Sequence, residues 1–151
     1  MNNLYKNQSG ELLINLIVTL AIIGTLAVIS MPLLKNYQPG LKLNLAAKNL
    51  TSDLRYIQQQ TITEQKIHMI QFSTSTNSYD LLKFDTATST LKSVFLPTDI
   101  SFDSISGFYD NIVKFNPYGA VYEYGSIVLV NTSSTTKTIN IKPSGYVELQ
   151  Q

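Results

Sequence analysis

The sequence predicts an α+β protein in which a long N-terminal helix, apolar in its first half, packs its second half on an antiparallel β-sheet domain. Three observations predict this fold. An apolar run occupies residues 12–34, a helical apolar stripe follows it, and the remainder alternates short β-type runs with turn residues. The 151 residues leave room for one modest domain once the apolar run has been subtracted.

The composition argues against several classes of function. Lys and Arg number 11 and Asp and Glu number 10, so the formal charge of +1 does not predict nucleic-acid binding. The absence of cysteine excludes disulfides, thiolate metal sites and cysteine nucleophiles.

The segment Leu12–Leu34 carries no ionisable side chain over 23 residues. As a helix it would be about 35 Å long, enough to cross about 30 Å of hydrocarbon. The rest of the chain is too small to bury it on all sides, which argues against a soluble core helix. It is also longer than the roughly 7–15 apolar residues of a secretory signal, which argues against cleavage after it. We therefore expect a membrane-spanning helix.

The start of this run resembles the processing segment of type IV prepilins. The similar residues are Ser9-Gly10-Glu11-Leu12-Leu13-Ile14-Asn15, followed in the family register by Ala21-Ile22-Ile23-Gly24. The resemblance implies that a prepilin peptidase cuts after Gly10 and usually methylates the new N-terminus. Pro32 matches a proline that pilin helices often carry, where it can kink the helix during assembly.

Two positions differ from the family pattern. The first mature residue is normally apolar but is Glu11 here, and the family glutamate four residues later is replaced by Asn15. A neutral amide costs less in a bilayer than a carboxylate, and it attracts a cation less. Some family members without this glutamate are thought to lie at the filament tip, so Asn15 predicts a minor, tip-located subunit. Our hypothesis for Glu11 is that its carboxylate neutralises its own amine.

The charges around the run favour the opposite orientation. Lysines are more numerous after it (Lys35, Lys42 and Lys48) than before it (Lys6). By the positive-inside rule, this count would place the C-terminal part in the cytoplasm. The resemblance outweighs the count and implies a single-pass inner-membrane protein whose globular domain lies outside the cytoplasm.

Beyond Pro32, apolar residues recur at spacings of three and four, which predicts an amphipathic helix to about Glu64. The stripe comprises Leu43, Ala47, Leu50, Leu54 and Ile57, and a bend is expected before it at Pro39–Gly40. Strands of an antiparallel sheet are predicted at Ile67–Phe72, Tyr79–Phe84, Leu91–Leu96, Ile112–Phe115, Ser126–Val130, Thr138–Ile141 and Tyr146–Leu149. The first two form a hairpin through Ser75–Ser78.

The C-terminal part also carries a looser resemblance. Phe115-Asn116-Pro117-Tyr118-Gly119 and Gly145-Tyr146-Val147 resemble the ending of minor pseudopilins of the GspH and FimT type. Together the two resemblances imply four parts: a leader at 1–10, a transmembrane and assembly helix at 11–34, its amphipathic continuation at 35–65, and a globular antiparallel β domain at 66–151.

Little in the sequence predicts chemistry. His68 is the only histidine, and we expect it to be a partly exposed strand residue without a catalytic role. Asp99, Asp103 and Asp110 are candidate calcium ligands, but they lack the spacing of an EF-hand, and a solvated acidic loop is favoured. We therefore expect no enzyme and no cofactor.

Tyr118, Lys137 and Lys142 are the candidates for binding single-stranded DNA by stacking and charge, as proposed for DNA-uptake minor pilins. Tyrosines are ordinary residues of strand faces, and three dispersed lysines make a weak basic patch. DNA is therefore an alternative partner that the sequence does not favour.

These observations predict a minor pilin or pseudopilin of a type II secretion pseudopilus, a type IV pilus or a competence pilus. Its implied partners are other pilins, bound through the N-terminal helix, the prepilin peptidase, an inner-membrane assembly platform and the membrane itself. The alternatives are a DNA-binding minor pilin and an unprocessed single-pass membrane protein with a β domain.

Overall fold

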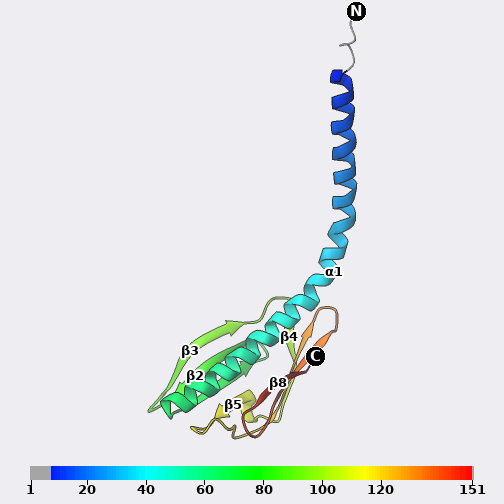
Figure 1. Cartoon of the computed structure of the whole chain (residues 1–151). Helices are drawn as coiled ribbons and strands as arrows, with labels where there is room; N and C mark the ends of the chain where they lie inside the picture. Colours follow the sequence, from blue (N-terminus) through cyan, green and yellow to red (C-terminus); the bar gives the residue numbers. More distant parts are fainter. Residues whose placement is uncertain (1–7, 151) are drawn as a thin grey trace, which may run out of the picture. The chain divides into compact units, whose positions relative to one another are not determined.

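A computed structural model describes residues 8–150, and within that range the side chains of residues 10–30 and 38–150. The elements in chain order are α1 (Gln8–Glu64), β1 (Ile67–Ser73), β2 (Ser78–Phe84), β3 (Thr88–Phe95), β4 (Ile100–Ser106), η1 (Tyr109–Asn111), β5 (Ile112–Phe115), β6 (Gly125–Asn131), β7 (Thr136–Ile141) and β8 (Val147–Gln150) (Figure 1). The chain divides between Gln38 and Pro39 into two units, and each is described by itself.

The N-terminal unit contains the apolar part of α1. Gly10–Ser30 is long enough and apolar enough to cross a membrane, and all of its side chains are exposed. The hydroxyl groups of Thr25 and Ser30 donate to carbonyl oxygens of the preceding turn at 2.8 Å. These two hydroxyl groups therefore keep a hydrogen-bond acceptor within the helix when the segment enters hydrocarbon.

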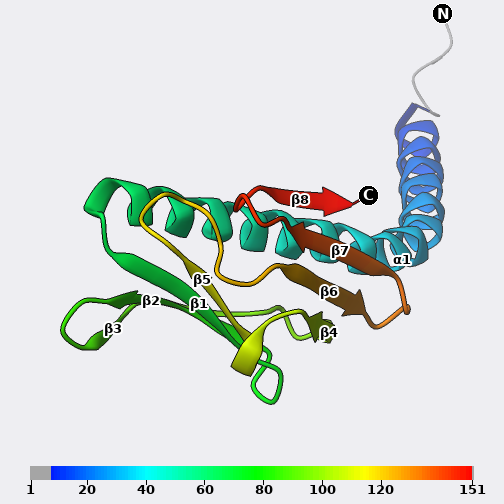
Figure 2. The ribbon, with the colours of Figure 1, turned by 90° about the horizontal axis from the view of Figure 1, so that it is seen from below.

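The second unit packs the C-terminal part of α1 against β-sheets (Figure 2). The five stripe residues Leu43, Ala47, Leu50, Leu54 and Ile57 are each at most 1% exposed, which confirms the predicted stripe. Pro39 and Gly40 both lie inside α1, so the helix continues through the position of the predicted bend. Packing of the stripe outweighs the backbone hydrogen bond that a proline removes.

Two antiparallel four-stranded sheets form where the sequence analysis expected one sheet. Their strand orders are β3-β2-β1-β5 and β4-β6-β7-β8. β1 and β2 form the predicted hairpin, with Ser73 opposite Ser78. The sheets meet in the core, where the rings of Phe72 and Phe102 lie edge to face with centroids 5.6 Å apart.

β4 was not predicted as a strand. Its pairing with β6 shifts register between Phe102 and Ser104, so the alternation of inward and outward residues breaks within the strand. Ile100 and Phe102 nevertheless point into the core.

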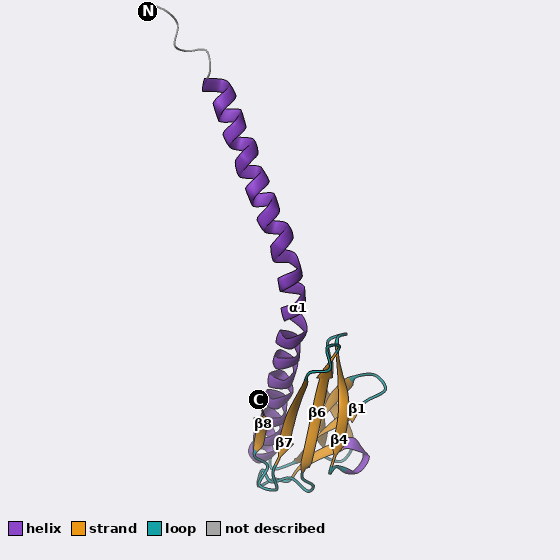
Figure 3. Cartoon of the chain, turned by 90° about the vertical axis from the view of Figure 1, so that its right-hand side faces the viewer, coloured by secondary structure: helices purple, strands orange, loops and turns teal. Residues whose placement is uncertain are grey.

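The C-terminal part of α1 also covers the edge of the second sheet, where β8 lies beside it (Figure 3). A guanidinium nitrogen of Arg55 donates to the carbonyl oxygen of Val147 at 3.0 Å. Gln58 donates from its side chain to the carbonyl oxygen of Gly119 at 2.7 Å. α1 is thus tied to β8 and to the turn before β6.

Candidate functional site

The predicted processing and assembly residues lie at the start of the apolar part of α1. Gly10, Glu11 and Asn15 are all exposed, and a spacing of four places Glu11 and Asn15 on the same helix face as Thr19. The hydroxyl of Thr19 donates to the backbone carbonyl of Asn15. Among the residues described, the side-chain amide of Asn15 makes no hydrogen bond, so it is available to a partner. Pro32 belongs to α1, but its side chain lies outside the described part.

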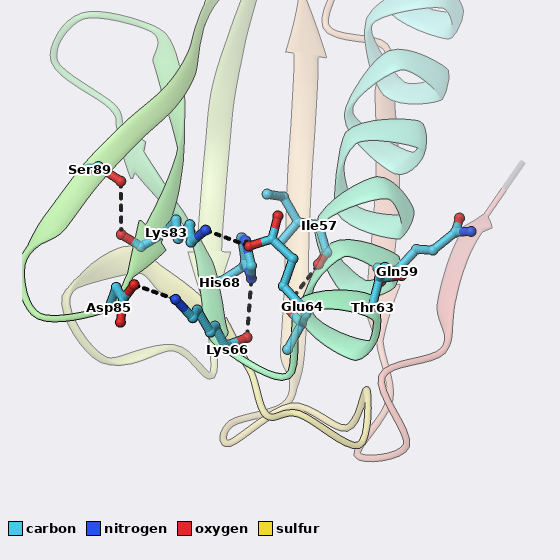
Figure 4. Close-up of polar contacts among 10 residues, drawn as sticks. Ile57, Gln59, Thr63, Glu64, Lys66, His68, Lys83, Asp85 and Ser89 are labelled. Atoms are coloured by element: carbon cyan, nitrogen blue, oxygen red, sulfur yellow. Dashed lines mark hydrogen bonds and ion pairs between the residues drawn. The ribbon is translucent and has the colours of Figure 1, made fainter.

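A polar cluster joins the end of α1 to the first sheet (Figure 4). Glu64, the last residue of α1, accepts from the ammonium of Lys83 on β2 at 2.6 Å. Lys66 forms an ion pair with Asp85. Together these ion pairs hold the α1–β1 connection against the end of β2.

His68 lies beneath these ion pairs and is completely buried, so the prediction of a partly exposed residue is wrong. It occupies an inward position of β1, two residues before Ile70, and strand alternation directs both side chains into the core. Its Nδ1 lies 3.1 Å from the carbonyl oxygen of Lys66 and its Nε2 lies 3.6 Å from Oε2 of Glu64. Because a carbonyl oxygen only accepts, Nδ1 carries the donated proton.

This cluster ties the end of α1 to the first sheet. Nε2 of His68 has no hydrogen-bond partner among the described residues, and the ring is closed off from solvent. Within residues 8–150, no group of three or more His, Cys, Asp or Glu is placed to hold a metal ion.

The Glu64–Lys83 pair predicts an acid dependence of stability. The hydrogen bond from Lys83 lowers the pKa of Glu64, so the stabilising contribution of the pair is complete above the pKa of Glu64 in the unfolded chain and is lost as the pH falls through the lower folded pKa. We expect Glu64→Gln to destabilise the domain at neutral pH and to reduce the further loss of stability in acid. Thermal unfolding of the full chain in detergent between about pH 6 and about pH 3 measures both effects.

Asp103 provides the matched control for that experiment. Its carboxylate is exposed and makes no ion pair among the described residues, so Asp103→Asn should keep the acid dependence of the unchanged chain. A Glu64→Gln profile parallel to that of the unchanged chain would contradict the assignment.

The three calcium candidates are not brought together as a metal-binding group in the described part of the chain. Asp99 forms an ion pair with Lys42 of α1. Asp103 lies on β4 and Asp110 in η1, so the predicted acidic loop is wrong for Asp103. Their separation on different elements removes the convergence of oxygen atoms that calcium requires.

Only two of the three DNA candidates share one end of the domain. Tyr118 is 90% exposed on the turn before β6, and Lys142 lies on the turn after β7. These turns are neighbours, since the Val121 amide donates to the carbonyl oxygen of Pro143 at 3.3 Å. Lys137 lies near the opposite end of β7.

Lys142 is also engaged within the domain. It pairs with Glu148 at 2.9 Å, and this hydrogen bond raises the pKa of the Lys142 ammonium. It lies 5.5 Å from the ring centre of Tyr146 as well. The negative charge of Glu148 offsets that of the Lys142 ammonium, so Lys142 attracts a phosphate less strongly.

A pocket that the sequence analysis did not identify lies on the first sheet. Its volume is about 330 Å³, and we call it the tyrosine pocket; its lining residues are Ile67, Tyr109, Ile112, Lys114, Tyr122 and Glu123. The residues come from β1, η1, β5 and the segment before β6, so only the tertiary fold brings them together. The one hint in the sequence is that Ile67 and Ile112 are apolar residues at strand positions that point away from the core.

Comparison with known proteins places this geometry in a fold group. No protein-family model matches the sequence, and no curated protein matches it. Among solved structures, the minor pseudopilin EpsH from the type 2 secretion system of Vibrio cholerae matches with a TM-score of 0.63 and 9% identity, over 72% of this chain and 96% of EpsH. The type IV minor pilin FimU from Pseudomonas aeruginosa matches with a TM-score of 0.63 and 13% identity, over 76% of this chain and 92% of FimU.

The chain has a pilin-like fold. A second EpsH structure agrees, with a TM-score of 0.59 at 9% identity over 72% of this chain and 92% of EpsH. The pilin-like fold confirms the predicted α+β class and the predicted likeness to minor pseudopilins. At these identities the likeness concerns the fold alone.

Proposed function

We propose that this chain is a minor pilin or pseudopilin, a filament subunit held in the inner membrane until assembly. The observation that carries the proposal is a pilin-like domain preceded in the same chain by Gly10–Ser30, an apolar helical segment with every side chain exposed. A surface of this kind needs hydrocarbon or other helices around it. A membrane followed by a filament of packed helices supplies both in turn, with the globular domain outside the cytoplasm.

In this proposal, a prepilin peptidase removes residues 1–10 by cutting after Gly10. Residues 11–34 then serve as transmembrane and assembly helix, residues 35–65 continue it, and residues 66–151 form the β domain. The new N-terminus is Glu11, whose carboxylate lies close to its own amine. Assembly with other pilins then takes place on an inner-membrane platform of a type II secretion system, a type IV pilus or a competence pilus.

Asn15 supports a position at the filament tip. A carboxylate at this depth would be stabilised by the amine of an adjoining subunit, whereas an amide gains less from that contact. A subunit at the tip lacks that adjoining subunit, so the presence of Asn15 in place of the family glutamate costs it little. Pro32 provides a point at which the helix can deform during extraction from the membrane.

Expression of the full chain with and without a prepilin peptidase tests the proposal. Intact mass and N-terminal sequencing should give a peptidase-dependent product that starts at Glu11, methylated or not. Gly10→Val should remain uncut, because a branched side chain then occupies the position that the peptidase reads as glycine.

Gly24→Ala is the matched control, since Gly24 lies in the same helix and has open space where a Cβ would be. It should be cut like the unchanged chain. A product that starts at Met1 or Asn2 with the peptidase present would favour the unprocessed single-pass alternative.

The DNA-binding alternative has narrower support. It rests on the exposed ring of Tyr118 and on Lys142 at the neighbouring turn. Salt-dependent binding of a single-stranded oligonucleotide that disappears in Lys137→Ala with Lys142→Ala would favour it. A structural subunit would show no such binding.

A further inference from the structure

We propose that the tyrosine pocket is a docking site for another protein chain, which inserts an apolar side chain next to an acidic one. The inference concerns the β domain and goes beyond the proposed filament role. It does not depend on cleavage after Gly10 or on the position of Asn15.

The floor of the pocket belongs to the face of the first sheet that points away from α1. In β1, His68 and Ile70 point into the core, so alternation directs Ile67 and Met69 to the opposite face. Met69 lies opposite Lys114 of β5 in the sheet register. These pairings place the lining side chains of β1 and β5 on one surface.

That outer face carries an apolar layer of its own. Met69 is 8% exposed and its cross-strand partner Leu82 is 7% exposed, yet neither belongs to the cluster of core residues. Ile67 and Ile112 extend the layer and are half-buried. A solvated sheet face would normally carry polar residues at these positions. Of this layer, Ile67 and Ile112 line the pocket and offer their exposed apolar surface to a partner.

Two exposed tyrosines form the walls. Tyr109 is 75% exposed and Tyr122 is 59% exposed. Tyrosine rings give large contact area with little loss of side-chain entropy, which makes them frequent anchors in protein interfaces. Glu123 accepts a hydrogen bond from the backbone amide of Tyr109 at 2.6 Å, so it fixes the backbone of one wall beside the other.

The backbone that carries Tyr109 is strained. Asp110 and Asn111 have φ values of 53° and 55°, in the left-handed region, which is unfavourable for residues with a side chain. Asp and Asn tolerate this region better than other residues with side chains, but two in succession are unusual. Such strain persists where the surrounding structure fixes it, and it is concentrated at functional sites.

Close backbone contact fixes the two walls relative to each other. Gly107 precedes Tyr109 by two residues, and a Cβ on it would lie 2.3 Å from the carbonyl oxygen of Tyr124. A Cβ on Gly125 would lie 2.0 Å from the carbonyl oxygen of Ser106. The segments before Tyr109 and after Tyr122 therefore cross without space for side chains, which preorganises the pocket for binding.

The charges indicate what the partner carries. Lys114 lines the pocket and makes no ion pair among the described residues, whereas Glu123 is occupied by the Tyr109 amide. A carboxylate beside the inserted side chain would complement Lys114. A nucleic acid fits less well, because one lysine is a weak phosphate site.

Two blocked dipeptides test the proposal on the full chain in lipid nanodiscs. The probes are acetyl-Phe-Asp-amide and acetyl-Phe-Lys-amide, and the readout is the NMR shift of the tyrosine rings on titration. The unchanged chain should bind the Asp probe about two- to fivefold more tightly than the Lys probe. Lys114→Glu should reverse that preference.

Matched variants separate the pocket from the rest of the surface. Lys48→Glu changes an exposed lysine of α1 and should keep the preference for the Asp probe. Tyr122→Ala should weaken binding of both probes, whereas Tyr124→Ala, which changes an exposed tyrosine that does not line the pocket, should not.

Three results would overturn the proposal. They are equal binding of the two probes, no saturable binding below about 10 mM, and an oligothymidylate that shifts the pocket tyrosines at lower concentration than either dipeptide. None of these results would affect cleavage after Gly10, so the proposed filament function is tested separately.

Discussion

Replacement of Gly145 by alanine is expected to lower the free energy of unfolding of the β domain by about 2–5 kcal/mol. Gly145 has a φ of 83°, a left-handed conformation that costs alanine about 1–2 kcal/mol. A Cβ there would lie 2.0 Å from the carbonyl oxygen of Gly119 and 2.6 Å from Nε2 of Gln58. One of these atoms is backbone and cannot move without shifting its turn.

The added methyl group would also act on a contact that fixes α1. Nε2 of Gln58 donates to the carbonyl oxygen of Gly119 at 2.7 Å, and these are the two atoms nearest to the new Cβ. Relief of the overlap therefore moves the turn before β6 away from α1, and this hydrogen bond is lost. A partly buried acceptor left without its donor adds to the cost.

Gly40 provides the control. It lies in α1, and apart from its chain neighbours and the adjacent helix backbone no described atom lies within 4 Å of the position that a Cβ would take, so alanine there should stabilise the chain by up to about 1 kcal/mol. Denaturant unfolding of the full chain in detergent, followed by the near-ultraviolet circular dichroism of its tyrosines, compares the two variants. Equal stability of Gly145→Ala and Gly40→Ala would show that the turn is not held against α1.

Local periodicity was enough to predict much of the fold. Side chains that face a core recur every three or four residues in a helix and every second residue in a strand. This recurrence predicted the stripe on α1 and the strands at residues 67–72, 79–84 and 112–115. The division into two sheets does not follow from such signals. β5 pairs with β1, which is far away in the sequence, and the choice depends on contacts made only in the folded domain.

The candidate sites differ in how much of each could be predicted from the sequence. Gly10 and Asn15 were identified by resemblance to prepilins, and their exposed positions on α1 are compatible with that interpretation without testing it. The burial of His68 was missed because a histidine between apolar residues fits either face of a strand. Its burial depends on a tertiary contact, because Glu64 at the end of α1 covers the His68 ring.

Leu54→Ala is expected to destabilise the β domain by about 2–5 kcal/mol, because deletion of a buried leucine side chain loses its transfer free energy and leaves a cavity. Leu54 is 0% exposed and belongs to a single core cluster that joins α1 to both sheets. A cavity at this position removes packing from several elements at once. Denaturant unfolding of the full chain in detergent measures the loss.

Leu45→Ala removes the same atoms from the same helix at a position that is 51% exposed, so it should change stability by no more than about 0.5 kcal/mol. Both variants exchange leucine for alanine within α1, so the change in helix propensity is the same in each. The difference between their free energies of unfolding therefore measures the effect of burial. Equal effects would mean that the stripe is not the packing face of α1, and the helix would then have to be held to the β domain by its polar contacts from Arg55 and Gln58 alone.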